Sequence, residues 1–372
     1  MPKNIVLCCD GTANEFAKNK TNVIKLYSVL EHDPKIQATY YHPGLGTMEP
    51  VGALSPFRRR FTRLLGKAIG YGLENDVRDA YVFIMQTFEP DDKLFLFGFS
   101  RGAYTVRAVA SLLHMYGLLR PGNESLVPYA IRMMTGIQRA KENDADHQQA
   151  VGDYFRLADE FKATLSCADC RPWLVGVWDT VSSVGWLENP LKLPFVTDNP
   201  DIEIGRHAIA IDEHRAFFRT HLWRPGNDPA RPHGPKDLLQ VWFPGVHCDV
   251  GGGYPEEESG LSKIALAWML DEAERHGLQV DPKRKAAMLG QSPGSPFVAP
   301  DPKGDMHESL KGFWKIAEFI PKRHFNWQKK KEERRMNLYR RRTIPPGSLI
   351  HHSAYDRGAD YAKRLPDNVT RV

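Results

Sequence analysis

Short apolar segments alternate along the chain with longer stretches in which apolar residues recur at helical spacing. The apolar segments predict buried strands at residues 4–9, 38–41, 94–97, 173–178, 207–211 and 238–243. The longer stretches predict helices at residues 22–30, 70–88, 103–113, 125–141, 150–165 and 261–276. Uninterrupted apolar strands are typical of a parallel sheet that is covered on both faces. The alternation therefore predicts an α/β fold with a mainly parallel sheet and helices on both faces.

The character of the chain changes after residue 278. Proline and glycine interrupt residues 281–304, and an aromatic and basic stretch follows them. We therefore expect a sheet domain over residues 1–280, in which residues 120–170 form a helical insertion placed to act as a lid. Residues 281–372 are expected to form a C-terminal appendage.

A candidate nucleophile lies between the strand at 94–97 and the helix at 103–113. The connection is GFSRG at residues 98–102, which fits the pattern G-x-S-x-G. Its two glycines let the backbone turn sharply, so that the Ser100 hydroxyl is exposed at the head of the helix. The strand-turn-helix context strengthens a pattern that is weak alone in a chain with 30 glycines. We predict a nucleophilic serine; the alternative is an ordinary helix N-cap.

A nucleophilic serine needs a base to take its proton and a carboxylate to orient that base. In parallel-sheet hydrolases these partners follow later strands, in the order Ser, Asp, His. Asp179 directly follows the strand at 173–178, and His247 lies in a glycine-rich loop after the strand at 238–243. We therefore predict Asp179 as the acid and His247 as the base.

Other residues compete for these roles. Asp212 and His214 follow the strand that ends at residue 211, so they form a second acid and base pair. Asp249 could replace Asp179 as the carboxylate, although bonding the backbone of its glycine-rich loop is the simpler role. Asp179 itself could cap a helix instead of taking part in catalysis.

The oxyanion of an acyl-transfer reaction needs backbone N–H donors. The first candidate is the amide of Arg101, directly after the predicted nucleophile. The second is the turn Gly11-Thr12 after the first strand, because glycine leaves its amide accessible; the alternative is an ordinary turn. Asp10 begins the same turn and is a candidate for a different chemistry, that of a phosphatase.

Seven motifs contain or accompany these candidate residues. In the order of the chain they are CDGTAN at residues 9–14, YHPGLGT at 41–47, GFSRGAY at 98–104, VWDTV at 177–181, HAIAIDEHR at 207–215, VWFPGVH at 241–247 and DVGGGY at 249–254. Together they resemble the uncharacterised α/β-hydrolase domain family that includes type VI secretion phospholipase effectors. The resemblance runs over residues 5–268 and returns weakly at residues 350–353.

This resemblance implies an α/β-hydrolase-like fold and a serine esterase or lipase mechanism, with the nucleophile at Ser100, the acid at Asp179 and the base at His247. Two positions depart from the family pattern: Ala13 replaces a tryptophan, and Cys248 stands where serine is frequent. The leading hypothesis is a serine hydrolase that cleaves carboxylic esters through an acyl-enzyme, with lipids or phospholipids as candidate substrates. The substrate does not follow from the fold.

Two rival functions remain open. A hydrolase-like scaffold could serve binding alone. A phosphatase could use Asp10, because CCDGT at residues 8–12 is similar to the D-x-D-G-T motif of haloacid-dehalogenase-type phosphatases. In those enzymes the first aspartate attacks, and here Cys8 holds that position.

The net charge of +5 comes from one segment of the chain. Residues 322–342 contain ten Lys or Arg and two Glu, a balance of +8, so the remainder carries −3. With Phe325, Trp327 and Tyr339 interspersed, this segment is a candidate for peripheral contact with anionic lipid headgroups. The alternative is a solvated helix or a surface loop. No nucleic-acid partner is expected, because no recognisable binding fold accompanies the charge.

No apolar run approaches the roughly 20 residues of a membrane-spanning helix, and residues 5–9 are too short for a signal-peptide core. The five cysteines form an odd, sparse set that fits a reducing compartment. We expect cytoplasmic synthesis, with signal-less secretion left open. Cys167 and Cys170 form a single CxxC without further zinc ligands, so we infer neither a metal nor another cofactor.

Overall fold

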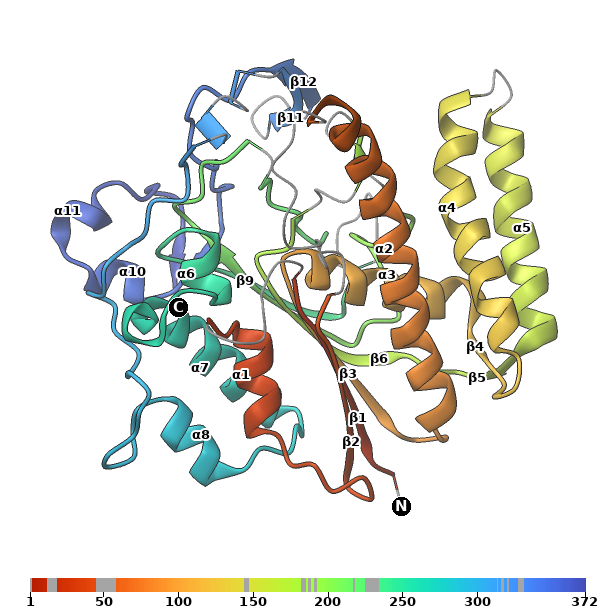
Figure 1. Ribbon diagram of the computed structural model, residues 1–372, viewed down its shortest axis with the longest axis horizontal. Coiled ribbons are helices and arrows are strands. Elements are labelled where there is room, and N and C mark those ends of the chain that lie inside the picture. Colours follow the sequence, from red (N-terminus) through yellow and green to blue (C-terminus); the bar gives the residue numbers. More distant parts are fainter. Residues whose placement is uncertain are drawn as a thin grey trace.

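The computed structural model describes residues 2–11, 19–44, 58–143, 147–181, 185–186, 189–190, 193–216, 218–224, 234–312, 314–315, 318–319, 321–326 and 331–372. Its centre is an eight-stranded sheet in the order β14-β13-β10-β9-β6-β3-β1-β2 (Figure 1). Every neighbouring pair in this sheet is parallel. The predicted α/β fold with a mainly parallel sheet is therefore confirmed.

The strands are β1 (Asn4–Cys9), β2 (Gln37–His42), β3 (Lys93–Phe99), β6 (Pro172–Trp178), β9 (Ile204–Ala210), β10 (Asp237–Phe243), β13 (Leu349–Ile350) and β14 (Thr370–Arg371). The first six coincide with the predicted strands to within three residues at either end. Strands β13 and β14 belong to the C-terminal segment, so this segment adds two strands to one edge of the sheet.

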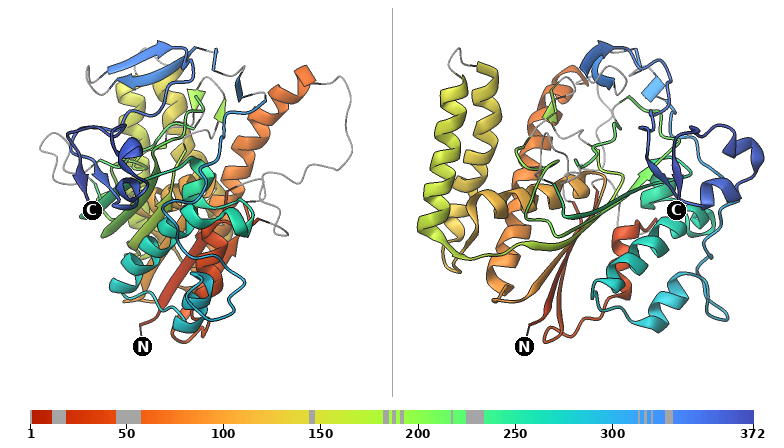
Figure 2. Two further views of the ribbon diagram at one scale, coloured as in Figure 1. Left: turned by 90° about the vertical axis from the view of Figure 1, so that its left-hand side faces the viewer. Right: turned by 180° about the vertical axis from the view of Figure 1, so that it is seen from behind.

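The main helices are α1 (Asn22–Val29), α2 (Arg58–Thr87), α3 (Arg101–Tyr116), α4 (Val127–Asn143), α5 (His147–Leu165), α7 (Gly260–Arg275) and α8 (Pro282–Met288). They cover both faces of the sheet because side chains alternate along each strand. In β1, Ile5 and Leu7 join the core with α2 and α3, whereas Val6 and Cys8 join the core with α1 and α7. Figure 2 shows the two helical layers from the side and from behind.

Three peripheral features complete the description. Helices α4 and α5 form an antiparallel pair beside α2 and α3 (Figure 1); a lid role for this pair stays a prediction. The basic segment contains an antiparallel hairpin of β11 (Lys322–Asn326) and β12 (Lys331–Arg335), so the alternative of a solvated helix or surface loop is wrong for these two strands. Trp327 lies outside the described residues. Short helices α6 (His247–Gly251), α10 (Ser353–Asp356) and α11 (Ala359–Ala362) lie near the ends of β10 and β13.

In the part of the chain that the structure describes, no helix is long and apolar enough to cross a membrane.

Candidate active site

The predicted nucleophile lies in a strained turn between β3 and α3. Ser100 has φ +58° and ψ −117°, a conformation that is costly for a residue with a side chain. Gly98 and Gly102 leave no room for a side chain, because other backbone atoms lie too close to them. A Cβ on Gly98 would lie 2.5 Å from the carbonyl oxygen of Gly102, and a Cβ on Gly102 would overlap the carbonyl of Cys9. The turn therefore needs glycine at both positions, and it places Ser100 at the carboxyl end of β3.

Asp179 and His247 meet at the carboxyl ends of β6 and β10. The distance from Nδ1 of His247 to Oδ2 of Asp179 is 2.5 Å, and both side chains are buried. The backbone N–H of Asp179 donates to the carbonyl of Ala208, and Oδ1 of Asp179 accepts from the N–H of Ala210, both in β9. These bonds fix the carboxylate against the sheet, with its second oxygen facing the imidazole.

A third charged group, Arg342, completes this arrangement from the C-terminal segment. Its Nη1 lies 2.5 Å from Oδ1 of Asp179, and its Nη2 lies 3.0 Å from Oδ2. Nη1 also donates to the carbonyl of Ala210, and Nε and Nη2 both donate to the carbonyl of Phe218. A guanidinium has five N–H donors, so all five are used here.

Arg342 and His247 keep Asp179 ionised in spite of its burial. Burial alone would raise the pKa of Asp179, but the charge of Arg342 and the hydrogen bond from His247 together hold that pKa well below its ordinary value. For His247, burial has the larger effect on the pKa. Burial lowers the pKa of His247, and the hydrogen bond to Asp179 offsets only part of the decrease. The imidazole is therefore neutral at neutral pH, as a proton acceptor must be.

Aromatic rings enclose the imidazole of His247. The ring of Phe99, which directly precedes Ser100, lies 4.6 Å from it between centroids, and the ring of Phe218 lies 4.8 Å away in an edge-on contact. The guanidinium of Arg215 covers the Phe218 ring at 3.4 Å. Because Phe99 is bonded to Ser100, its contact with His247 ties the serine turn to the Asp179–His247 pair.

Glu213 supports the same histidine from its backbone side. Its carboxylate accepts hydrogen bonds from the backbone N–H of His247 at 3.2 Å and from the hydroxyl of Ser309 at 3.0 Å. Arg215 also donates to it through both its backbone and its guanidinium. Burial would raise the pKa of Glu213, but the Arg215 guanidinium lowers it to about 2. Glu213 is thus a buried anion that anchors the start of α6.

Of the predicted oxyanion donors, two lie beside Ser100. The amide of Arg101 is at the first position of α3, where an N–H has no partner within the helix. Gly11 faces the serine so closely that a Cβ added to it would lie 3.1 Å from Cβ of Ser100. The N–H of Gly11 donates to Oδ1 of Asp10 at 2.7 Å. Thr12 lies outside the described residues.

The remaining candidates are held in other networks. The carboxylate of Asp10 accepts hydrogen bonds from Thr21 and Tyr41, at 2.5 and 3.0 Å. Asp249 accepts from the N–H groups of Val246 and His307, and its Oδ1 lies 2.6 Å from Nδ1 of His307. It thus bonds the backbone beside His247, in the manner expected for a loop-organising residue.

The structure does not bring the competing acid and base together. Asp212 is bound by Arg364, Tyr361 and the N–H of Gly245. His214 lies 3.9 Å from Glu308 instead. No group of three or more His, Cys, Asp or Glu among the described residues is placed to hold a metal ion.

Sequence reasoning missed Arg342 and Glu213. Arg342 is one of ten cations in a basic run, and nothing in the run distinguishes it or points to Asp179, 163 positions earlier. Glu213 lies beside Asp212 in the HAIAIDEHR motif. The only usable signal for Glu213 is its position shortly after a strand that ends at the site.

A family model matches most of the chain. It is described as "T6SS, Phospholipase effector Tle1-like, catalytic domain" and matches residues 3–272. Among individual proteins, the uncharacterised protein YEL023C of Saccharomyces cerevisiae is 36% identical, over 75% of this chain and 58% of the yeast protein.

Two solved structures are more distant. An uncharacterised protein from Pseudomonas aeruginosa has 20% identity and a TM-score of 0.42, over 77% of this chain and 48% of its own. The Tle1 effector bound to the VgrG spike from the type VI secretion system has 17% identity and a TM-score of 0.36, over 70% of this chain and 52% of its own. This chain thus spans roughly half the length of these relatives. Because the family model covers well over half of the chain, the protein belongs to the Tle1-like phospholipase effector catalytic domain family.

Proposed function

We propose that this protein is a serine hydrolase of carboxylic esters, with Ser100 as nucleophile, His247 as base and Asp179 as the acid. The observation that carries the proposal is the buried 2.5 Å contact between Asp179 and His247, beside a serine held in a strained strand-to-helix turn. A strained turn that exposes a serine hydroxyl is the arrangement that α/β-hydrolases use for catalysis.

The reaction follows from the protonation states at neutral pH. Ser100 Oγ attacks the acyl carbon while Nε2 of neutral His247 takes its proton, which forms a tetrahedral oxyanion and an imidazolium. Asp179, ionised at this pH, stabilises the imidazolium through Nδ1. His247 then returns the proton to the leaving alcohol oxygen as the C–O bond breaks. Water repeats the sequence on the acyl-enzyme and releases the carboxylic acid.

The amide of Arg101 is the proposed main donor to the oxyanion. It lies one residue after Ser100 at the start of α3, where the helix dipole also favours negative charge. The N–H of Gly11 donates to Asp10 in the structure, so its use by the oxyanion would require that bond to open on substrate binding.

A lipid substrate is supported by membership of the phospholipase effector family and by apolar side chains exposed in the C-terminal segment that carries Arg342. Four large apolar side chains there are at least two-fifths exposed: Phe319, Met336, Leu338 and Tyr339. The rings of Phe319 and Tyr339 are in edge-on contact, 5.9 Å apart between centroids. The basic hairpin β11–β12 joins the same segment (Figure 2). Exposed apolar groups on a segment that directly follows a Lys- and Arg-rich hairpin suit an anionic lipid surface.

Hydrolysis is tested with Ser100→Ala on p-nitrophenyl esters, triacylglycerols and phospholipids. A matched control is Ser28→Ala, which removes an exposed serine on α1 whose hydroxyl donates to the carbonyl of Lys25. We expect the control to keep wild-type activity and Ser100→Ala to lose activity and fluorophosphonate labelling together. Retained ester hydrolysis in Ser100→Ala would remove the proposal. Magnesium-dependent phosphatase activity that disappears in Asp10→Asn would support the rival phosphatase function.

Lipid contact is tested separately, by co-sedimentation with liposomes. Phe319→Ala combined with Met336→Ala removes two exposed apolar side chains. The control is Ile36→Ala on the α1–β2 connection, because Ile36 is 50% exposed and Phe319 is 51% exposed. We expect the double variant alone to lose binding to anionic liposomes. Binding that is indifferent to anionic lipid, or equal in all three proteins, would contradict lipid contact at this surface.

A further inference from the structure

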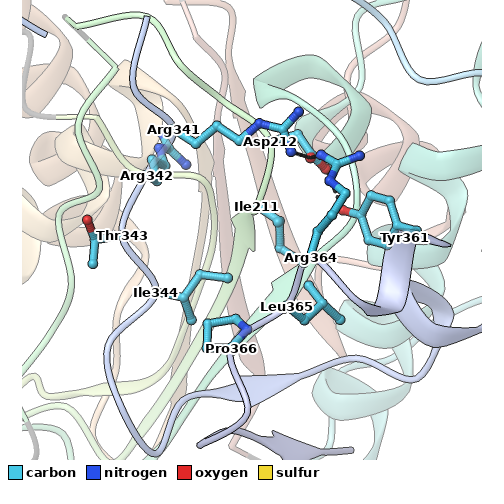
Figure 3. A pocket seen from close by; sticks show the side chains of 10 residues that line it. All are labelled: Ile211, Asp212, Arg341, Arg342, Thr343, Ile344, Tyr361, Arg364, Leu365 and Pro366. Atoms are coloured by element: carbon cyan, nitrogen blue, oxygen red, sulfur yellow. Dashed lines mark hydrogen bonds and ion pairs between the residues drawn. The ribbon is translucent and has the colours of Figure 1, made fainter. Parts of the chain in front are cut away.

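A concave site of about 250 Å³ lies beside the Asp179 end of the candidate active site. Three chain segments meet there: the end of β9, the segment that carries Arg342, and the turn after α11. The residues that line it are Ile211, Asp212, Arg341, Arg342, Thr343, Ile344, Tyr361, Arg364, Leu365 and Pro366 (Figure 3). Nothing in the proposed ester hydrolysis uses this site.

Its charges do not balance. Three guanidinium groups line the site, and Asp212 supplies its one carboxylate. The charge of Arg342 is neutralised by Asp179, and all five of its N–H groups already donate hydrogen bonds. Arg341 and Arg364 therefore share Asp212, and both approach the same oxygen, Oδ1, at 3.4 and 3.0 Å. The site thus carries an excess of one positive charge.

Among the residues that the structure describes, most N–H groups of Arg341 and Arg364 have no protein partner and can bind another group. Each guanidinium has five donors, and each gives one to Asp212. The 3.4 Å contact of Arg341 is also long for a hydrogen bond. The other carboxylate oxygen, Oδ2, is occupied by the Tyr361 hydroxyl and the N–H of Gly245. Asp212 therefore positions the two arginines without saturating them.

The shape of the site adds a second requirement for its ligand. Figure 3 shows the guanidinium groups of Arg341 and Arg364 converging on Asp212 along one side of the site. Ile344, Leu365 and Pro366 lie along the other side, with Ile211 between. A ligand that matches both sides has a compact oxyanion at one end and carbon atoms at the other.

We propose that this pocket binds a phosphate group, and in particular a phosphate ester, through Arg341 and Arg364. Two planar guanidinium forks can each bond two oxygens of one tetrahedral phosphate, which is the geometry for which arginine is best suited. The excess positive charge is offset by the ligand, and its carbon portion contacts the apolar side. The phosphate is either that of a membrane lipid or that of a free phosphate compound.

The test measures binding and needs no turnover, so its outcome is independent of the proposed hydrolase function. Inorganic phosphate and glycerol 3-phosphate are titrated by calorimetry against chloride at equal ionic strength. The pocket variant is Arg341→Gln with Arg364→Gln. Its matched control is Lys303→Gln with Lys363→Gln, which removes the same charge from two exposed side chains outside the lining; Lys363 is 75% exposed.

We expect glycerol 3-phosphate to bind the wild type and the control alike, and the pocket variant to bind at least about tenfold more weakly. Two arms separate the sources. Loss of phosphatidic-acid vesicle binding in the pocket variant alone assigns the site to a lipid phosphate, whereas unchanged vesicle binding with lost glycerol 3-phosphate binding assigns it to a free compound. Equal losses in the pocket and control variants, or no phosphate binding above chloride, would overturn the proposal.

Discussion

Replacing Arg342 by methionine tests whether the C-terminal segment is part of the candidate active site. The side chain of Arg342 is 7% exposed and that of its partner Asp179 is fully buried. Methionine keeps much of the unbranched volume of arginine but offers no donor. The change therefore strips two hydrogen bonds and one neutralising charge from a buried carboxylate.

The expected loss of stability is large because one partner of a buried pair is removed. Leaving the other charge buried and uncompensated costs about 3–5 kcal/mol. Asp179 retains the hydrogen bonds from His247 and Ala210, which places the expected loss of unfolding free energy near the lower end, about 3 kcal/mol. The neighbouring Arg341 provides the control. It is 47% exposed with one long contact to Asp212, so Arg341→Met should cost under about 1 kcal/mol.

Catalysis should respond as well, with a definite sign. Arg342 is a positive charge on the same carboxylate that binds His247, so its removal favours the protonated imidazole and raises the pKa of His247. The acid limb of the kcat/KM profile gives the pKa of the base in the free enzyme, so this limb should move to higher pH. The shift is expected to be about one pH unit, which corresponds to a charge–charge interaction of about 1.4 kcal/mol.

The assay combines urea unfolding in phosphate-free buffer with pH–rate profiles on a soluble ester. Arg342→Lys serves where the methionine variant is too unstable, because it keeps the charge and loses the fork; its acid limb should stay close to that of the wild type. The reasoning is refuted if Arg342→Met is as stable as Arg341→Met. An acid limb that is unmoved or shifts to lower pH would refute the electrostatic part alone.

Three further predictions concern the surroundings of His247. Gly251→Ala places a Cβ inside the ring of Phe99, so it should lower the unfolding free energy by about 1–3 kcal/mol and reduce kcat by displacing the ring from His247. In Gly152→Ala of α5, no described atom lies within 4 Å of the added Cβ, so the unfolding free energy of this control, measured with denaturant, should rise by up to about 1 kcal/mol. Glu213 has its pKa lowered to about 2, so its contribution is present above its unfolded pKa near 4.3 and is lost as the pH falls toward 2. Glu213→Gln should therefore cost about 3 kcal/mol at pH 7 and nearly nothing at pH 2, and an equal cost at both would contradict the assignment. His307 lies between Asp249 and Glu258, and although burial opposes it, bonds to both carboxylates raise its pKa; its contribution is present below an unfolded pKa of about 6.5 and is lost as the pH rises through the folded value. His307→Gln should accordingly destabilise more at pH 6 than at pH 9 in thermal melts.

Much of the fold was readable from local pattern. The six long strands of the sheet are apolar runs, and the glycines at positions 98 and 102 mark a turn that only glycine permits. The ends of strands are therefore predictable, and Ser100, Asp179 and His247 were all placed at such ends from sequence. In a parallel sheet these ends share one edge, so all three residues are expected at that edge, but their order does not say which side chains there form a pair.

The spacing of apolar residues does not predict strands that are very short or mostly polar. Strands β13 and β14 have two residues each, too few to show any periodicity. The hairpin β11–β12 consists largely of Lys, Arg and Glu, which have low strand propensity, so its charge suggested a solvated helix or loop. In both cases the pairing partner, and not the segment itself, decides the conformation.

Burial periodicity and turn chemistry are properties of neighbouring residues, so the α/β fold and the strand-end positions of a serine, an aspartate and a histidine follow from local pattern. Which charges meet depends on the folded arrangement. It joined Asp179 to His247 and not Asp212 to His214, and it brought Arg342 to Asp179 across 163 positions. Such pairs depend on how distant segments pack, and a basic run looks the same in sequence whichever of its arginines becomes buried.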